Sequence, residues 1–348
     1  MLAGLSTAAL LGGFALAALV VLLTGMRITR LVDRLADRTG LGEALAGAVL
    51  LGAATSLGGT IVSVTVATDG LASLAYSNSI GGIAAQTAFL AIADLTYRKA
   101  NLEHAAADLA NIFQAVVLIV LLSLPLIAMT APEVTLGAVH PVSLAIPAVY
   151  VAALLTTQGL RDTPMWRPVD TADTRADTPE TESAAARRRS TARLFVDLVV
   201  LMVVMAAAGW TIAKVAGALT GRLDLSGSLV GALATAVVTS LPELVTTIAA
   251  VRRGALQLAV GGIIGGNTFD TLFLTLADVF YRDGSLYHAV GAQDRFWSLT
   301  AILMTAILLG GLLLRQRIGP ARIGAESLAL LLVYAGAIAL QVLIGARG

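Results

Sequence analysis

The sequence predicts an all-α polytopic membrane protein with ten transmembrane helices, arranged as two inverted five-helix repeats. Three observations lead to this class. Of the 348 residues, 57% are apolar and only 13% are charged, against roughly 25% charged in a soluble domain. The apolar residues fall into runs long enough to cross a bilayer, and a long internal repeat divides these runs into two sets of five.

Division of the apolar runs at charges, prolines and glycines gives the ten elements. Each is about 20 residues long or slightly longer, as a membrane-spanning helix requires. We expect the first run to be a retained helix, since it has no preceding basic region and no small-residue cleavage site. The ten spans are 4–25, 42–68, 71–96, 105–129, 139–159, 193–217, 225–250, 255–280, 289–314 and 322–345.

The basic residues predict the orientation of these spans. With the N-terminus outside, the cytoplasmic loops collect 18 of the 23 Lys and Arg residues. Positively charged loops favour the cytoplasmic side. We therefore expect a multi-pass protein of the cell membrane with both termini extracytoplasmic.

The connection from Arg161 to Ser190 separates the two sets of spans. Residues 161–193 hold 13 of the 45 charges and include Arg187, Arg188 and Arg189. Such a segment is typical of a disordered cytoplasmic linker. We expect residues 1–159 to form the first half, 160–192 the linker and 193–348 the second half. A tether whose arginines enforce topology is favoured over a regulatory segment.

A shift of the chain by 184 positions aligns residues 41–104 with 225–288 without a gap. The alignment has 22 identities in 64 positions, and these include polar and helix-breaking residues. Each half contains an odd number of spans, so the second copy crosses the membrane in the opposite sense. Such inverted repeats are typical of secondary transporters, whose substrate site lies near the bilayer midplane where interrupted helices meet.

Glycine and proline predict where the helices are interrupted. Glycines weaken the second span, a proline interrupts the seventh, and paired glycines loosen the third and eighth. These residues are Gly52, Gly58 and Gly59, then Pro242, then Gly81, Gly82, Gly265 and Gly266.

Two carboxylates lie in the middle of predicted spans, Glu243 in the seventh and Asp270 in the eighth. Ionisable residues at this depth are costly and point to function. Together with the hydroxyls of Thr55, Ser56, Thr239 and Ser240 they form an all-oxygen set. Such a set suits calcium or sodium rather than zinc or copper. The alternative is that both acids only satisfy polar groups between helices.

The runs Thr239–Thr246 and Gly261–Asp270 carry a resemblance to a known family. The 31-residue spacing from Thr239 to Asp270, repeated from Thr55 to Gln86, is similar to that of the alpha repeats of the sodium/calcium exchanger family, within the cation/calcium exchanger superfamily. The resemblance covers the chain except for the linker. It implies ion-site positions at Ala236, Thr239, Ser240, Glu243 and Asp270, opposed by Gly52, Thr55, Ser56 and Gln86.

The first repeat departs from the family pattern. Where the family has Pro-Glu after Thr-Ser-Leu, this chain has Gly58 and Gly59. Gly82 and Gly266 stand where a serine is usual, and Gln86 stands where an amide or an acid is usual. One central acid is therefore missing, and a calcium-bridging pair of glutamates cannot form.

Repeated residues outside the motif suggest anchoring. Asp94 and Asp278 each precede an arginine by four residues, which predicts ion pairs with Arg98 and Arg282 on one helix face. We expect His104 and His288 to be solvated at helix starts, and Asp69 to mark an exposed turn between the second and third spans.

These features predict a secondary active cation antiporter and not an enzyme. Calcium exchanged against sodium or protons is implied by the resemblance. Two alternatives stay open: transport of another monovalent ion or of a larger solute occupying the space at Gly59, and a non-transporting protein on a degenerate exchanger fold. We expect no permanently bound cofactor, with inorganic cations and the bilayer as the partners and no nucleic acid. The sequence leaves the oligomeric state open.

Overall fold

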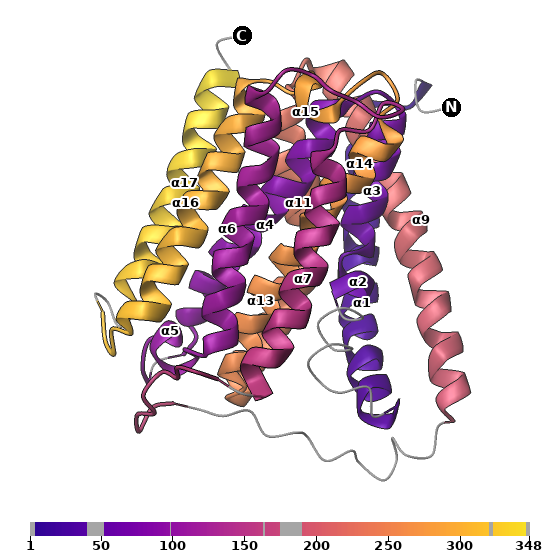
Figure 1. Cartoon of the computed structure of the whole chain (residues 1–348). Helices are drawn as coiled ribbons and strands as arrows, with labels where there is room; N and C mark the ends of the chain where they lie inside the picture. The colour runs from indigo at the N-terminus through magenta and orange to yellow at the C-terminus, as the bar shows by residue number, and fades with distance from the viewer. Residues whose placement is uncertain are drawn as a thin grey trace.

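The computed structural model describes residues 4–39, 52–97, 99–162, 164–174, 190–319 and 323–345, and its regular elements are helices (Figure 1). The first half contains α1 (Thr7–Thr39), α2 (Gly52–Thr55), α3 (Leu57–Thr68), α4 (Ala72–Asp94), α5 (Leu102–Ala105), α6 (Leu109–Thr130) and α7 (Val142–Asp162). The second half contains α9 (Thr191–Leu223), α10 (Gly227–Leu229), the π-helix η3 (Val230–Thr235), α11 (Ala236–Thr239), α12 (Leu241–Arg253), α13 (Leu256–Asp270), α14 (Leu272–Phe280), α15 (Leu286–Ala289), α16 (Ala292–Leu314) and α17 (Ala325–Gly345).

The two halves repeat each other along their whole length. The bounds of α9, α11 and α15 equal those of α1, α2 and α5 shifted by 184 positions. In Figure 1, α5 lies at the bottom of the bundle and α15 at the top, so the two copies run in opposite directions. Helix α1 begins and α17 ends at the same end of the bundle. The predicted inverted repeat is confirmed.

Within the described residues, six helices are long and apolar enough to cross a membrane, and a bent pair makes up to seven. The six are α1, α6, α7, α9, α16 and α17, and the pair joins 227–239 to 241–253 at an angle of 46°. The predicted spans 42–68, 71–96 and 255–280 correspond to α2–α3, α4 and α13–α14, which are shorter or more polar. The count of ten stays a prediction.

Helix α4 forms the centre of the bundle, with 21 of its 23 residues buried. It passes close to η3, because a Cβ on Gly81 would lie 2.4 Å from the Cα of Ala232. Small residues permit such backbone contact between helices. The prediction that Gly81 and Gly82 loosen the third span is wrong, since α4 is continuous. The eighth span breaks at Thr271 and not at Gly265 and Gly266.

The second and seventh spans break at equivalent serines. Ser56 separates α2 from α3, and Ser240 separates α11 from α12, with ψ near 0° at both (φ −81° and −95°). Pro242 lies in the first turn of α12, where its missing N–H costs no helical hydrogen bond. Both spans are interrupted as predicted, but the second span breaks at Ser56 and not at Gly58 and Gly59, which lie inside α3. The predicted exposed turn is also confirmed at Asp69, which pairs with Lys214 at 2.7 Å.

Asp94 ends α4 and fastens the loop that follows. Its Oδ1 accepts a hydrogen bond from the backbone N–H of Leu102 at 2.8 Å, and its Oδ2 accepts one from that of Gly324 at 3.0 Å. The hydroxyl of Ser327 also hydrogen-bonds this carboxylate. Asp94 therefore joins α4, α5 and the start of α17. Its predicted partner Arg98 lies outside the described residues.

Asp278 repeats this arrangement at the other end of the bundle. It accepts hydrogen bonds from Leu286 N (2.8 Å), His140 N (2.7 Å) and Ser143 Oγ (2.7 Å), each 184 positions from a partner of Asp94. The predicted Asp278–Arg282 ion pair is wrong, because Arg282 donates to the carbonyl of Val279. Buried backbone N–H groups need an acceptor, and the aspartate supplies it.

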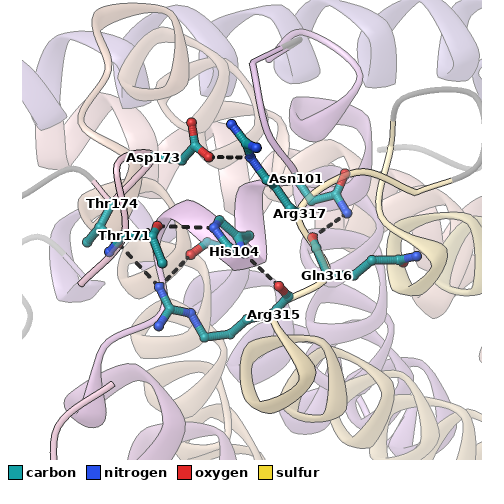
Figure 2. Close-up of polar contacts among 8 residues, drawn as sticks. All are labelled: Asn101, His104, Thr171, Asp173, Thr174, Arg315, Gln316 and Arg317. Carbon is teal, nitrogen blue, oxygen red and sulfur yellow. Dashed lines mark hydrogen bonds and ion pairs between the residues drawn. The ribbon is translucent and has the colours of Figure 1, made fainter. Parts of the chain in front are cut away.

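The start of the linker packs against the end of the bundle that holds α5 (Figure 2). The two ring nitrogens of His104 contact Arg315 O (2.6 Å) and Thr171 Oγ1 (3.1 Å). Arg317 pairs with Asp173 at 2.7 Å. His104 is thus buried between these partners, contrary to the predicted solvated histidine. Residues 164–174 hold defined contacts and are not a free tether, while 175–189 lie outside the described residues.

Candidate cation site

Four polar side chains from both halves meet where the two broken spans face α4 and α13. Ser56 Oγ donates to Asp270 Oδ1 at 2.7 Å. The Nε2 of Gln86 donates to Asp270 Oδ2 at 2.7 Å and to Ser240 Oγ at 3.1 Å. Ser56 is equivalent to Ser240, and Gln86 to Asp270. Each repeat therefore places one serine and one amide or acid at the centre.

Glu243 lies beside this group, in the first turn of α12. Its side chain is 9% exposed, is hydrogen-bonded by Thr55 and is close enough to Asp270 for their charges to interact. In the described chain, neither carboxylate forms an ion pair with a basic side chain. Two buried acids without a cationic partner are costly, so this site favours a bound cation or protons.

Three oxygens at this centre have no hydrogen-bond partner. They are Gln86 Oε1, Glu243 Oε2 and Asn267 Oδ1, all on buried side chains. Asn267 is held by its Nδ2, which donates to Thr87 Oγ1 at 3.0 Å. A buried oxygen without a protein partner is free to accept a bound ion or an ordered water. Neutral amide and carboxylate oxygens are ligands that calcium and sodium accept.

The remaining positions implied by the resemblance lie on the same elements but make other contacts. The hydroxyl of Thr239 donates back to its own helix, to Thr235 O (2.9 Å) and Ala236 O (3.2 Å). The Ala236 carbonyl also accepts from Ser240 N at 3.1 Å. Gly52 begins α2, one turn before the break at Ser56. The structure thus brings Ser56, Gln86, Ser240 and Asp270 into direct contact, pairs Thr55 with Glu243, and leaves Thr239, Ala236 and Gly52 outside these contacts.

Phe273 occupies the space beside Gly59, and sequence reasoning missed it. A Cβ added to Gly59 would lie 2.8 Å from Phe273 Cε2. The backbone carbonyl of Gly59 accepts from Asn78 Nδ2 at 3.1 Å. The ring therefore lies where a side chain at position 59 would begin. The identity of Phe89 and Phe273 in the repeat alignment was the available signal.

Two glycines border the central group and leave space around it. A Cβ on Gly82 would lie 3.5 Å from Ser240 Oγ, and one on Gly266 would lie 3.4 Å from Gln86 Oε1. Both distances are ordinary or only slightly tight contacts. The positions where the family usually has a serine are therefore at the site.

The composition of the site limits the metals it suits. Among the described residues, no three His, Cys, Asp or Glu side chains lie close enough together to hold a metal ion. The centre instead combines two carboxylates with hydroxyl and amide oxygens. This donor set carries low charge and matches a hard cation held in part by neutral ligands.

Comparison with known proteins agrees with this architecture. The sequence model of the sodium/calcium exchanger protein family matches residues 9–157 and 193–343, which leaves out the linker. Inner membrane protein YrbG of Escherichia coli (strain K12) is 31% identical over 114 residues, a match that spans 33% of this chain and 35% of that protein.

Solved structures share the fold at low identity. The crystal structure of the H+/Ca2+ exchanger CAX superposes with a TM-score of 0.68 at 14% identity, covering 97% of this chain and 87% of that one. The sodium-calcium exchanger NCX_Mj gives a TM-score of 0.62 at 17% identity, covering 96% and 99%. Native YfkE gives 0.60 at 16% identity, covering 95% and 92%.

Proposed function

The chain belongs to the sodium/calcium exchanger protein family, and from that premise we propose that it exchanges calcium against sodium or protons across the membrane. It acts as a secondary active antiporter by alternating access of its two inverted halves around a site near the midplane. The proposed ligands are the nine positions Glu243, Asp270, Thr239, Ser240, Thr55, Ser56, Gln86, Ala236 and Gly52. The domains proposed are 1–159, the linker 160–192 and 193–348.

The single observation that carries this proposal is the group of four side chains that joins the two halves. Asp270 of one half accepts hydrogen bonds from Ser56 and Gln86 of the other. A cation that drew Asp270 Oδ1 and Oδ2 toward itself would loosen these two bonds. Cation binding is thereby coupled to the contact between the halves, which is the contact that alternating access must rearrange.

The charge of the site supports a changed coupling ratio. Glu243 and Asp270 together neutralise one divalent cation, whereas a site with more acids keeps negative charge for several sodium ions. We propose that fewer cations are exchanged per cycle than with a second central glutamate. Calcium binding is weaker as well, because calcium favours six to eight oxygens and Gly59 supplies no side-chain donor.

Protons compete with the cation in this proposal. Two neighbouring buried carboxylates need neutralisation, and a proton can supply it when no cation is bound. Apparent cation affinity should therefore fall as the medium is acidified. Binding by purified protein that does not change across the mildly acidic range would contradict this competition.

The deciding experiment is ion flux into proteoliposomes. Calcium, sodium, potassium and pH gradients are imposed one at a time, and calcium uptake is expected only when sodium or protons can move in the opposite direction. Asp270→Asn serves as the matched inactive control. Flux of another cation, with no calcium flux, would favour the alternative ion. No flux of any cation by well-folded protein would favour the non-transporting alternative.

The proposed orientation has its own test. Leu136 is 66% exposed in the loop between α6 and α7, and Met165 is 98% exposed at the start of the linker. Cysteines introduced singly at these positions should react with a membrane-impermeant reagent from opposite sides, the first from outside. Labelling of both from one side would refute the proposed topology.

A further inference from the structure

The two loops fastened by Asp94 and Asp278 differ at the buried position that follows Leu102 in one and Leu286 in the other. On the Asp278 side this position is Tyr287, whose hydroxyl shares a hydrogen bond with Ser143 Oγ at 2.8 Å. On the Asp94 side it is Glu103, whose Oε1 accepts from Ser327 Oγ at 3.2 Å. A tyrosine hydroxyl keeps its proton at every physiological pH. A carboxyl in the same position can lose it.

Glu103 lies in α5, outside the long helices that span the membrane, yet it is fully buried. Within the described residues its Oε2 has no hydrogen-bond partner. Glu326, at the start of α17, is 7% exposed, and its Oε1 also has no partner. A Cβ on Gly324 would lie 2.3 Å from this Oε1, and the N–H of Gly324 donates to Asp94. The carboxyls of Glu103, Glu326 and Asp94 thus lie around the same turn of backbone.

Among the described residues, the charged groups that face Glu103 from neighbouring elements are acidic. Asp94 comes from α4 and Glu326 from α17, and both interact with Glu103 electrostatically. His104, the next residue of α5, instead contacts Thr171 and Arg315 O. The guanidinium of Arg315 donates to His104 O and to Thr174 Oγ1. No described ion pair neutralises the three acids. Burial, and then the two neighbouring carboxylates, raise the pKa of Glu103 well above its usual range.

We propose that the Glu103–Glu326–Asp94 cluster is a proton-binding site, in which Glu103 holds a resident proton that fastens α5 to the start of α17. One proton on Glu103 neutralises the carboxyl that interacts electrostatically with both Asp94 and Glu326. It also makes Glu103 the neutral counterpart of Tyr287 in the other loop. No metal is needed, and no three of the described acids and histidines lie close enough to hold one.

This site is separate from the candidate cation site. Eight residues of α4 separate Gln86 from Asp94, which is about 12 Å along a helix. Loss of the proton would leave three negative charges within one buried loop. Since the same helix α5 holds the start of the linker through His104, the loosened loop would also release residues 164–174. The site therefore gives one end of the bundle a buried carboxyl that can lose its proton, where the other end has the hydroxyl of Tyr287.

Infrared difference spectroscopy on the purified full chain in lipid tests this proposal directly. Between neutral and alkaline pH we expect the carbonyl band of protonated carboxyls to lose intensity, and we expect the component of this loss that belongs to Glu103 to be absent in Glu103→Gln. Glu133→Gln is the control, because Glu133 lies in the loop between α6 and α7 and accepts from Ser285 N, and this variant should keep the signal. A band of unchanged intensity in Glu103→Gln would overturn the proposal.

A second variant separates a proton site from a merely structural contact. Glu326→Gln removes one neighbouring charge, so Glu103 should lose its proton at a lower pH, and the midpoint of the band should shift downward. An unshifted midpoint would overturn the proposal, and neither readout depends on transport.

The proton on Glu103 should also make the thermal stability of the protein depend on pH. A buried acid whose pKa is raised stabilises the fold below its ordinary pKa and loses that contribution as pH rises through the raised value. The melting temperature of the parent should therefore fall on the alkaline side. The fall should be smaller in Glu103→Tyr, which copies Tyr287. Equal falls in parent and variant would count against the resident proton.

Discussion

The broken span of the second half carries a glutamate beside its serine, and the broken span of the first half carries a glycine. In the second half, Glu243 receives a hydrogen bond from Thr55 of the other half. In the first half, Gly59 offers Thr239 nothing equivalent, and Thr239 bonds its own helix instead. Phe273 fills the remaining space. The two halves therefore differ at equivalent positions of their broken spans, with an acid in one half and a glycine beside an aromatic ring in the other.

The largest effect should come from the acid that the second half retains. Glu243→Gln removes the only glutamate at the centre and leaves Asp270 to hold the cation alone, so exchange should fall below detection. Calcium-dependent flux in proteoliposomes measures this, with the melting temperature as the control for folding. If the variant transports as well as the parent, the cation site lies elsewhere.

Restoring the acid to the first half should fail unless the ring is removed as well. Gly59→Glu places a Cβ 2.8 Å from the Phe273 ring, and overpacking of this kind costs about 1–3 kcal/mol. The double variant Gly59→Glu with Phe273→Ala provides the room, and it should bind calcium more tightly than the parent. Calcium titration and thermal melting of both variants measure the effect.

Phe273→Ala alone is the matched control for this pair. It leaves a cavity that should cost about 3–5 kcal/mol without adding a ligand, so its calcium affinity should not rise. Equal stability of Gly59→Glu and the parent would show that the ring does not limit the site.

The sequence alone predicted the repeat, the breaks and the polar centre, because each depends on residues that mark the local chain. Pro242 marks the interrupted seventh span locally, because proline cannot donate a helical hydrogen bond. The partners of Asp278 could not be predicted in this way, since His140 and Ser143 lie 138 and 135 positions away. Arg282 is close to Asp278 in the sequence and was therefore the predicted partner. In the folded protein, backbone N–H groups bind Asp278 instead.

Glycine was the least reliable signal in the sequence. Gly81 permits close packing against Ala232 in a continuous helix, and Gly254 ends α12 with φ at 86°. Glycine thus allows close packing of two helices at one position and a left-handed backbone conformation at another. The role of each glycine depends on which helix packs against it, and this contact cannot be read from the sequence. The filling of the space at Gly59 by Phe273 was missed for the same reason.

The two aspartate-fastened loops should differ in stability when each acid is neutralised. Asp278→Asn leaves three hydrogen-bond donors facing an amide, which should cost about 1–3 kcal/mol. Asp94→Asn loses equivalent contacts but also removes one of the two negative charges that lie beside protonated Glu103, so its cost should be smaller. Thermal melting of the two variants at neutral pH measures the difference. A larger loss in Asp94→Asn would mean that repulsion among the three acids is negligible.

The smallest effect should come from adding the serine that the family usually has. A Cβ on Gly82 would lie 3.5 Å from Ser240 Oγ and 3.9 Å from Asp270 Oδ2, so Gly82→Ser fits without moving backbone and brings one more hydroxyl to the cation. A single added hydrogen bond or neutral ligand contributes about 0.5–1.5 kcal/mol, and calcium affinity should therefore rise by roughly tenfold at most. The neighbouring Gly81→Ser is the control, because its Cβ would lie 2.4 Å from the Ala232 backbone and should destabilise the bundle instead. If Gly82→Ser weakens binding while the protein keeps its melting temperature, the cation does not lie on the side of the centre that Gly82 faces.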